Sequence, residues 1–342
     1  MAKEKKLRIY SNLSGFNIYY VIMQHYGARV PDNFVITDIR ENNETNLHAS
    51  VVYRSSEPMP ETKAAWFAEI IQNPVSNSLF QWPIDLIEIK RATEYVVCLV
   101  YRNAQYSHMK PIKELLYQPG MSKILDWRNP FIITVCKYFL TAMSMLHSNG
   151  YIYNDFDIRN ILYNPDSGEV FFKFTPNLRK ARSNSQYDKV DCAAISPEFA
   201  PPFVYNEEMY NGFISKKTDY YQITALLFRL MIGRLPYEGR DLMNYGIVFD
   251  PQFDTDDNAH KYYFQHYHQY PHFIFDENDV SNSLSTTTDN DMPRERWKLL
   301  PDSVKNKFNE ILCGNAAESG TYKNITPDAW LKAVSSLETE SK

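Results

Sequence analysis

The sequence is poor in glycine and lacks a glycine-rich phosphate-binding loop. It has 11 glycines in 342 residues, and no Gly-x-Gly-x-x-Gly occurs near the N-terminus, where Gly15 and Gly27 each stand alone. Such loops hold phosphates because a backbone without side chains can approach them closely. The segment from Asn12 to Phe16 offers at most a partial version, so a nucleotide site built on a complete loop of this kind is excluded.

Cysteine is also scarce. The four cysteines form no Cys-x-x-Cys pair and are widely separated: Cys98, Cys136, Cys192 and Cys313. This spacing indicates reduced, buried thiols in a cytoplasmic protein. Four histidines lie close together in the sequence: His260, His266, His268 and His272. They lack acidic residues at metal-ligand spacing, which favours surface or packing roles over zinc, and no metal site is predicted.

The chain has neither an excess of positive charge nor a long apolar run. Its formal net charge of −5 at pH 7 argues against a dedicated nucleic-acid binder, which would show a basic face. The longest apolar region, 131–146, contains Lys137 and is predicted to be too short to span a bilayer. No apolar stretch follows the basic start, residues 1–8, so it is predicted to be a solvated tail rather than a signal peptide.

The residues that are present favour a large α+β protein. Hydrophobic residues make up 44% and aromatic residues 15% of the chain, enough for one bilobal domain or two ordinary ones. Strands are predicted at 33–39, 48–53 and 94–101, where β-branched and aromatic residues gather, and a helix at 62–72.

The rest of the chain is predicted to be mainly helical. Apolar residues recur near helical spacing in 130–148, where Pro130 suits the first turn and Gly150 the chain reversal. A second apolar helix is predicted at 218–232, closed by Gly233. The polar run 281–293 predicts a mobile loop.

The most informative segment is 151–162, which reads Tyr-Ile-Tyr-Asn-Asp-Phe-Asp-Ile-Arg-Asn-Ile-Leu. It resembles the protein-kinase catalytic loop, His-Arg-Asp-Leu-x-x-x-Asn. On that pattern Asp155 takes the catalytic-base position and Asn160 that of a magnesium ligand. Tyr153 and Asn154 replace the usual histidine and arginine.

Four further blocks follow kinase order: 144–152, 196–203, 218–228 and 233–239. Residues from about 66 to 333 therefore resemble a eukaryotic-like protein kinase. The resemblance implies an α+β, bilobal kinase-like fold. Its small β-rich N-lobe would be 1–102, including the basic tail, and its larger helical C-lobe 103–342. Within the C-lobe, 151–162 would be the catalytic-loop-like part and 173–203 the activation-segment-like part. Asp219 would be the characteristic acid of the central helix.

The departures from the kinase pattern concern phosphate and metal binding. Lys173 stands where the metal-binding aspartate of Asp-Phe-Gly belongs, and an ammonium cannot ligate magnesium. It could substitute for the metal charge or neutralise Asp155; a shifted register is the alternative. No strand lysine is found, but Arg54 lies just beyond that depth and could hold a phosphate. Glu69 is either its partner acid or an exposed helix charge.

A second pair of changes is consistent with an adapted domain. The glutamate that closes the activation segment is replaced by Phe203, and the arginine that pairs with it by Asn324. Losing both partners is tolerable, whereas losing one would leave a buried charge unpaired.

Blocks at 71–75, 81–85, 297–301 and 325–330 resemble bacterial kinase-like proteins of the TerY-linked type, associated with PP2C-type phosphatase and von Willebrand A proteins. The leading hypothesis is a cytoplasmic bacterial pseudokinase that regulates or scaffolds a protein partner of one of these two classes. ATP binding stays open, and Mg²⁺ or Mn²⁺ binding is not supported. The alternatives are an unconventional kinase or nucleotide-transferring enzyme that uses Asp155 and Asn160, and a purely structural component. No nucleic-acid or membrane partner is predicted.

Overall fold

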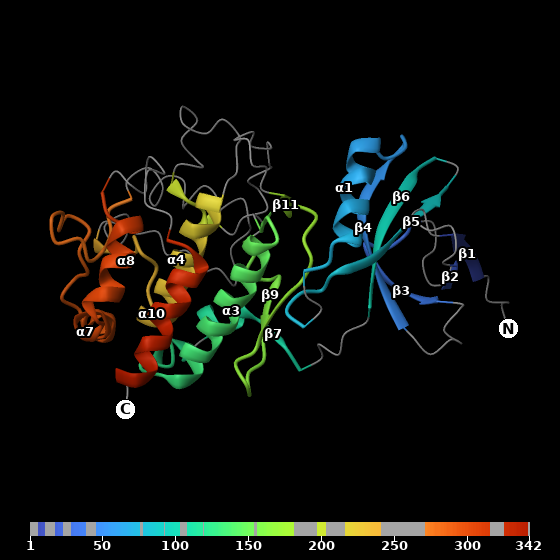
Figure 1. The fold of residues 1–342 in the computed structure, drawn as a ribbon. Helices are drawn as coiled ribbons and strands as arrows, with labels where there is room; N and C mark the ends of the chain where they lie inside the picture. The colour runs from blue at the N-terminus through green and yellow to red at the C-terminus, as the bar shows by residue number, and fades with distance from the viewer. Residues whose placement is uncertain are drawn as a thin grey trace. The chain divides into compact units, whose positions relative to one another are not determined.

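The computed structural model describes residues 6–10, 18–22, 29–38, 46–75, 78–91, 93–102, 108–118, 120–153, 156–180, 197–202, 216–240, 271–314 and 325–340. The chain divides into two compact units, Met1–His108 and Met109–Lys342 (Figure 1). The sequence predicts the boundary a few residues earlier, between 102 and 103. Asn103, the first residue of the predicted C-lobe, lies outside the described residues.

The first unit is built on a six-stranded antiparallel sheet with the order β1-β2-β3-β4-β6-β5. Its strands are β1 (Lys6–Tyr10), β2 (Ile18–Ile22), β3 (Asn33–Asp38), β4 (Asn46–Ser55), β5 (Pro83–Lys90) and β6 (Tyr95–Arg102). The predicted strands match β3, β4 and β6 in place. β1 and β5, at the two ends of the strand order, also contact each other, so the sheet curls.

The prediction of a solvated tail at residues 1–8 is wrong for its last three residues. They belong to β1, which pairs with β2 from Lys6 opposite Ile22 to Tyr10 opposite Ile18. Leu7 and Ile9 alternate with basic residues, and this period of two is the pattern of a strand with one apolar face.

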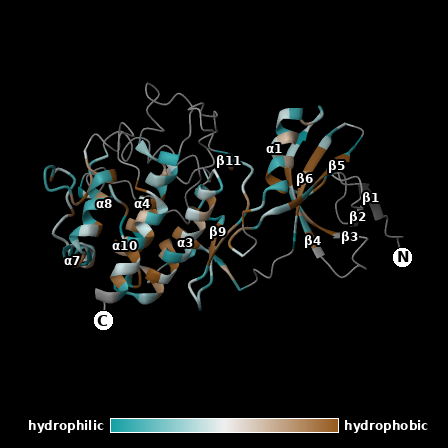
Figure 2. Cartoon of the chain, viewed as in Figure 1, coloured by the Kyte–Doolittle hydropathy of each residue, from teal (hydrophilic) through white to brown (hydrophobic). Residues whose placement is uncertain are grey.

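Helix α1 (Glu61–Gln72) contacts β5 in the same unit. Its apolar residues Phe67 and Ile70 are fully buried, and the Trp82 indole nitrogen donates to the Ile70 carbonyl oxygen at 2.8 Å. A separate apolar cluster is formed by side chains of β3, β4, β5 and β6, together with Val30. Figure 2 shows brown, hydrophobic stretches along strands of this sheet. Burial of this surface is the main force that stabilises the unit.

The second unit is mainly helical. Its helices are α2 (Ile112–Tyr117), α3 (Pro130–Ser148), α4 (Lys216–Ile232), α7 (Asp291–Leu299), α8 (Asp302–Leu312) and α10 (Pro327–Glu340). Its strands are β7 (Lys110–Pro111), β8 (Tyr151–Ile152), β9 (Ile161–Tyr163), β10 (Val170–Phe172) and β11 (Arg179–Lys180). They form two small antiparallel sheets, β10-β9-β7 and β11-β8.

Helix α3 begins and ends where the sequence predicts. The Asn129 side chain accepts from the Phe131 amide, Pro130 occupies the first turn, and Gly150 adopts φ of 79° just after the helix. A positive φ is easy for glycine because it has no Cβ. The apolar face of α3 packs against α10 and α4.

By length and composition alone α3 could cross a membrane, and it is the one such helix in the part of the chain that the structure describes. Half or more of its apolar window (56%) is buried inside the protein. The apolar region 131–146 was predicted to be too short to span a bilayer, but the helix that contains it is longer. The burial of α3, rather than its length, therefore indicates a core helix.

Helix α4 lies at the centre of an aromatic core. Phe228 on α4 contacts Phe273, Trp297 and Phe308 with ring centroids between 5.3 and 6.0 Å apart. The Trp330 indole of α10 is fully buried and donates to the Thr224 hydroxyl at 3.2 Å. This packing holds α4, α7, α8 and α10 together.

The predicted loop at 281–293 is more ordered than its polar sequence indicates. It contains the 3₁₀ turn η7 (Thr288–Asn290) and the start of α7. The side chains of Asn282 and Asn290 are almost fully buried. Asn282 donates to the carbonyl oxygens of Tyr237 and His272 at 2.9 and 2.8 Å. The buried side-chain amide of Asn282 thus supplies hydrogen bonds to backbone carbonyl oxygens. The composition of the segment does not reveal this role.

Cys98 and Cys136 are buried, as predicted, and Cys313 is half-buried. Burial raises the pKa of the Cys98 thiol to about 12, although the Arg54 charge acts in the opposite direction. A thiol with so high a pKa is a poor nucleophile. Cys192 lies outside the described residues.

Candidate functional site

The candidate site is the catalytic-loop-like segment of the helical unit. β8 forms the first two residues of this segment, and β9 begins near its end, at Ile161. Asn154 and Asp155, the arginine and base positions, lie outside the described residues. The other members of the segment can be placed, and they show how its backbone is held.

Asp219 of α4 holds the start of the segment. Its carboxylate is fully buried. Its Oδ2 accepts from the Tyr153 amide at 2.9 Å and contacts His147 Nε2 at 2.7 Å. One carboxylate therefore links three parts of the unit: α4, the end of α3 and Tyr153 in the catalytic-loop-like segment. The sequence singled out Asp219 correctly, and its contacts explain why an acid is needed there.

Aromatic packing surrounds the ring of Tyr153, the residue that the sequence resemblance aligns with a kinase histidine. Tyr153 makes edge contacts with Phe172 and Phe156, at centroid distances of 5.2 and 6.5 Å. Phe139 of α3 stacks on Phe172 and meets Phe156 edge-on. These rings are almost fully buried. The segment is thus held by apolar packing as well as by Asp219.

The structure brings Asn160 and Lys173 together through their backbones. The Lys173 amide donates to the Asn160 carbonyl oxygen at 2.8 Å, directly after the hairpin of β9 and β10. The Asn160 amide in turn donates to the Asp157 carbonyl oxygen at 2.8 Å. Backbone hydrogen bonds therefore connect Asn160 with Lys173 and with Asp157. Lys173 is half-buried.

Asp157, an acid close to Asp155, is occupied by a neighbour. Its Oδ1 accepts from both the amide and the Nε of Arg159, at 2.8 and 2.9 Å. Arg159 Nη2 also lies 2.9 Å from Asp157 Oδ2. A carboxylate bound by a bidentate arginine is a weaker metal ligand because its charge is already neutralised.

The two candidates of the first unit lie on β4 and α1. The Arg54 guanidinium donates to the Val30 carbonyl oxygen at 2.6 Å and to Asp32 at 3.3 Å, and it lies 3.5 Å from Glu94. Arg54 is therefore engaged by two acids within its own unit. Glu69 is half-buried on α1, and its carbonyl oxygen accepts from Asn73.

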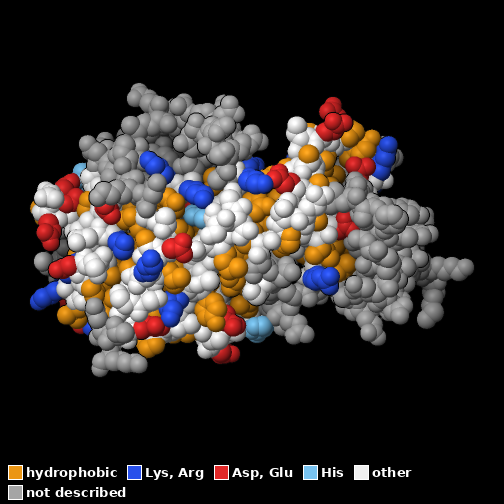
Figure 3. Space-filling view, in the orientation of Figure 1, with side chains coloured by type: hydrophobic (Ala, Val, Ile, Leu, Met, Phe, Trp, Pro, Cys, Tyr) orange, Lys and Arg blue, Asp and Glu red, His pale blue; other side chains and the backbone are white. Residues whose placement is uncertain are grey.

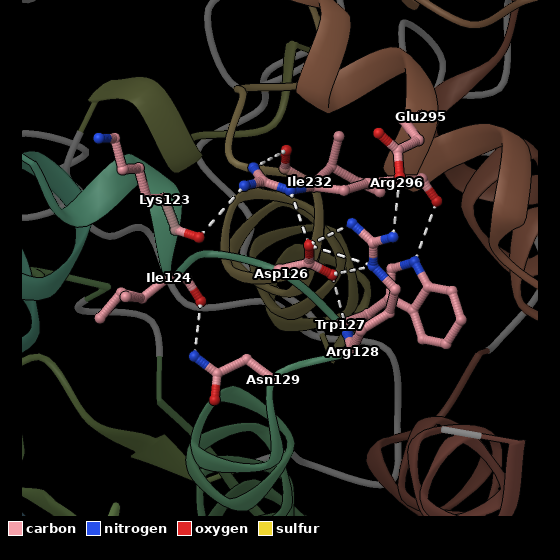
Figure 4. A network of polar contacts seen from close by, with 9 residues as sticks. All are labelled: Lys123, Ile124, Asp126, Trp127, Arg128, Asn129, Ile232, Glu295 and Arg296. Atoms are coloured by element: carbon pink, nitrogen blue, oxygen red, sulfur yellow. Dashed lines mark hydrogen bonds and ion pairs between the residues drawn. The ribbon is translucent and has the colours of Figure 1, made fainter. Parts of the chain in front are cut away.

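A polar network before α3 was missed by the sequence analysis (Figure 4). Asp126 accepts from Arg128 in a fork, at 3.1 Å to Nε and 2.8 Å to Nη2, and from Arg296 Nε at 3.1 Å. Arg296, from α7, is almost fully buried and also donates to the Ile232 carbonyl oxygen at 3.0 Å. The Trp127 indole nitrogen donates to the Arg296 carbonyl oxygen at 3.0 Å.

Burial of Asp126 acts to raise its pKa, but hydrogen bonds from Arg128 and the charge of Arg296 hold that pKa below the usual value. The available sequence signal was Asp-Trp-Arg just before a helix, which identifies a turn but not a partner 170 residues away. The network connects the start of α3, the end of α4 and α7.

Glu198 and Tyr117 form a second contact that the sequence did not indicate. Glu198 lies in the 3₁₀ turn η4 (Pro197–Phe199), the described end of the activation-segment-like part. Its side chain is buried and accepts from the Tyr117 hydroxyl at 3.1 Å. Phe203, Asn324 and residues 181–196 lie outside the described residues, so the proposed paired loss is not tested.

Comparison with models of known protein families finds no match. Among curated proteins, the chain is 26% identical over 140 residues to the probable serine/threonine-protein kinase PknB of Lactococcus lactis, covering 41% of this chain and 21% of that protein. It is 27% identical over 100 residues to protein kinase C-like 2 of Schizosaccharomyces pombe, covering 29% of this chain and 9% of that protein. The matched part thus spans about a fifth or less of these relatives.

Among solved structures, the autoinhibited serine kinase domain of the giant muscle protein titin aligns with a TM-score of 0.51 and 14% identity, over 97% of this chain and 79% of that chain. A Toxoplasma gondii virulence factor described as having a protein-kinase fold and no enzymatic activity aligns with a TM-score of 0.49 and 14% identity, over 99% and 85%. The titin likeness confirms the predicted α+β, protein-kinase-like fold, and fold alone does not decide activity.

Proposed function

We propose that this protein is a pseudokinase, a kinase-like domain that regulates or scaffolds a protein partner. The observation that carries this proposal is the place of Lys173. Its amide is hydrogen-bonded to Asn160 next to the β9–β10 hairpin, which supports the register that puts a cation at the position of the metal-binding carboxylate. Phosphoryl transfer depends on metal ions that neutralise charge on the phosphates.

Three further features support the loss of catalysis. The chain has no glycine-rich loop near its N-terminus. Arg54 is committed to Asp32 and Glu94 rather than available as a phosphate-holding cation. Asp157 is committed to Arg159. The described part of the domain nevertheless keeps a well-packed core around α4, so the fold itself is retained.

The proposed setting is a bacterial signalling system in the cytoplasm. Sequence blocks near 71–85 and 297–330 support a partner of the PP2C-type phosphatase or von Willebrand A class. On the face that Figure 3 shows, acidic and basic side chains of the helical unit are interspersed rather than gathered by sign. This mixture suits a protein partner better than a polyanion.

The first test is a thermal-shift titration of the full chain with ATP, with and without Mg²⁺ or Mn²⁺. We expect weak binding that does not require metal, because the groups that hold metal and phosphate are replaced. A ligand that binds the native state must raise the melting temperature. Micromolar affinity that depends on Mg²⁺ would contradict the proposal and favour the alternative, an unconventional kinase that uses Asp155 and Asn160.

The second test replaces Lys173 with aspartate. We expect the variant to unfold at a lower temperature, with a loss of about 1 kcal/mol from like charges that are partly screened by solvent, and to gain no Mg²⁺-dependent ATP binding. The kinase resemblance puts position 173 near Asp155, so an aspartate there would add a second carboxylate beside the first. The sequence also has no glycine-rich loop to hold phosphates. Differential scanning fluorimetry with and without ATP and Mg²⁺ measures both effects.

Two control variants make this result specific. Lys173→Met removes the cation without adding a carboxylate, and Lys298→Asp makes the same charge change at an exposed position of α7. Restored Mg²⁺-dependent ATP binding in Lys173→Asp alone would show that Lys173 is the last lost element of a working site, against the proposal.

A further inference from the structure

Glu198 is a buried carboxyl group whose direct partner is a phenol. The side chain is 4% exposed, and its Oε1 accepts from Tyr117, the last residue of α2. No lysine or arginine nitrogen of the described residues lies within ion-pair distance of Glu198. Next to it, Phe199 is fully buried and packs against Phe156, with the two ring centroids 5.9 Å apart. The carboxyl group is therefore buried beside apolar rings, without a cation of the described residues at ion-pair distance.

The arginine that contacts Tyr117 is directed away from Glu198. The Arg229 guanidinium of α4 lies over the Tyr117 ring, 5.1 Å from its centre. Its nitrogens donate to the carbonyl oxygens of Gly233 at 2.8 Å and Leu116 at 3.0 Å. It also lies 3.8 Å from Glu238. Arg229 thus holds Tyr117 in place but leaves Glu198 unpaired.

Two other charged groups face Glu198. Lys113 of α2 attracts its charge, and Asp157 of the turn before β9 repels it. Their effects are opposed, so burial dominates and raises the pKa of Glu198 above its usual value. The protonated form can accept from Tyr117 without a charge, whereas the ionised form must bear the cost of burial.

We propose that the Glu198 carboxyl group, buried beside Tyr117, is a proton-dependent latch, which fastens residues 197–202 to α2 and α4 when it is neutral and loosens when it ionises. The latch goes beyond the proposed pseudokinase role and does not depend on it. Its sign follows from linkage: the carboxyl group binds its proton more tightly in the fastened state than in the released state. Its contribution is complete below the ordinary pKa of glutamate and is lost as pH rises through the higher value of the fastened state.

The test compares the wild-type full chain with Glu198→Gln, which keeps an acceptor oxygen and cannot ionise. Hydrogen exchange is followed at the amides of Glu198, Phe199 and Ala200 from pH 5 to 8, with both proteins at the same pH so that intrinsic rates cancel. Between the two pKa values each pH unit changes the latch equilibrium by up to tenfold. We expect similar exchange at pH 5 and faster exchange in the wild type as pH rises. Identical exchange in both proteins at every pH would overturn the latch.

Two further variants control this experiment. Glu114→Gln removes a carboxylate of α2, the helix of Tyr117. The Glu114 side chain is 44% exposed, so this variant should behave as the wild type. Tyr117→Phe removes the donor to Glu198 and leaves the carboxyl group in place, so it also tests the latch if the glutamine variant does not fold. Because this hydrogen bond favours the ionised form, the pH of loosening should move upward in Tyr117→Phe; an unchanged midpoint would refute the proposal.

Discussion

Replacing Asp126 with alanine is expected to lower the free energy of unfolding by about 3 to 5 kcal/mol, the usual cost of leaving a buried charge without its partner. The Arg296 side chain is 2% exposed, and Asp126 is its ion-pair partner at 3.1 Å. After the substitution Arg296 keeps carbonyl acceptors, at Ile232 and at Lys123, but loses the carboxylate at 3.1 Å. Chemical denaturation of the variant and the wild type measures the loss.

Two other variants separate charge burial from simple loss of contacts. Arg296→Met should cost less than Asp126→Ala, because Asp126 keeps its fork with Arg128. Glu295→Gln removes an exposed partner of Arg128 (58% exposed) and should cost less than about 1 kcal/mol. Equal losses in Asp126→Ala and Glu295→Gln would show that the network does not stabilise the fold.

The same network should make the protein sensitive to acid. The pKa of Asp126 is lower in the folded state than in the unfolded chain, where it is about 3.9. Its contribution is therefore present above that value and is lost as pH falls through the folded-state pKa. The difference in stability between wild type and Asp126→Ala should shrink accordingly at low pH.

Replacing Asp219 with alanine is expected to cost about 3 kcal/mol and to loosen the start of the catalytic-loop-like segment. The substitution leaves two buried groups without their acceptor, the Tyr153 amide and His147 Nε2, and each such loss costs roughly 1 to 3 kcal/mol. Denaturant unfolding measures the total, and hydrogen exchange at the Tyr153 amide measures the local effect.

A matched aspartate of the same unit controls for the substitution itself. Asp328→Ala removes an exposed carboxylate of α10 that accepts from Ser144 at 2.6 Å, and it should cost less than about 1 kcal/mol. Unchanged exchange at Tyr153 in Asp219→Ala, together with normal stability, would show that α4 does not hold the segment through this carboxylate.

The sequence by itself determined the elements whose signal is local. Helix α3 is predicted at its observed bounds because Asn129, Pro130 and Gly150 act through backbone geometry within one or two turns. Strands β3, β4 and β6 are rich in β-branched and aromatic residues and were also found. Asp219 was identified because it belongs to an ordered set of kinase-like blocks, and the kinase-like fold followed from that order.

Only the tertiary structure decided which polar groups meet. Asp126 and Arg296 are 170 positions apart, and Tyr117 and Glu198 are 81 apart. No periodicity connects such residues, because their contact depends on how α2, α4 and α7 pack. For the same reason the polar segment 281–293 was predicted as a loop, although Asn282 and Asn290 are buried in it. Arg54 has the charge expected of a phosphate ligand, yet its ion pairs with Asp32 and Glu94 depend on residues brought near it by the folded sheet.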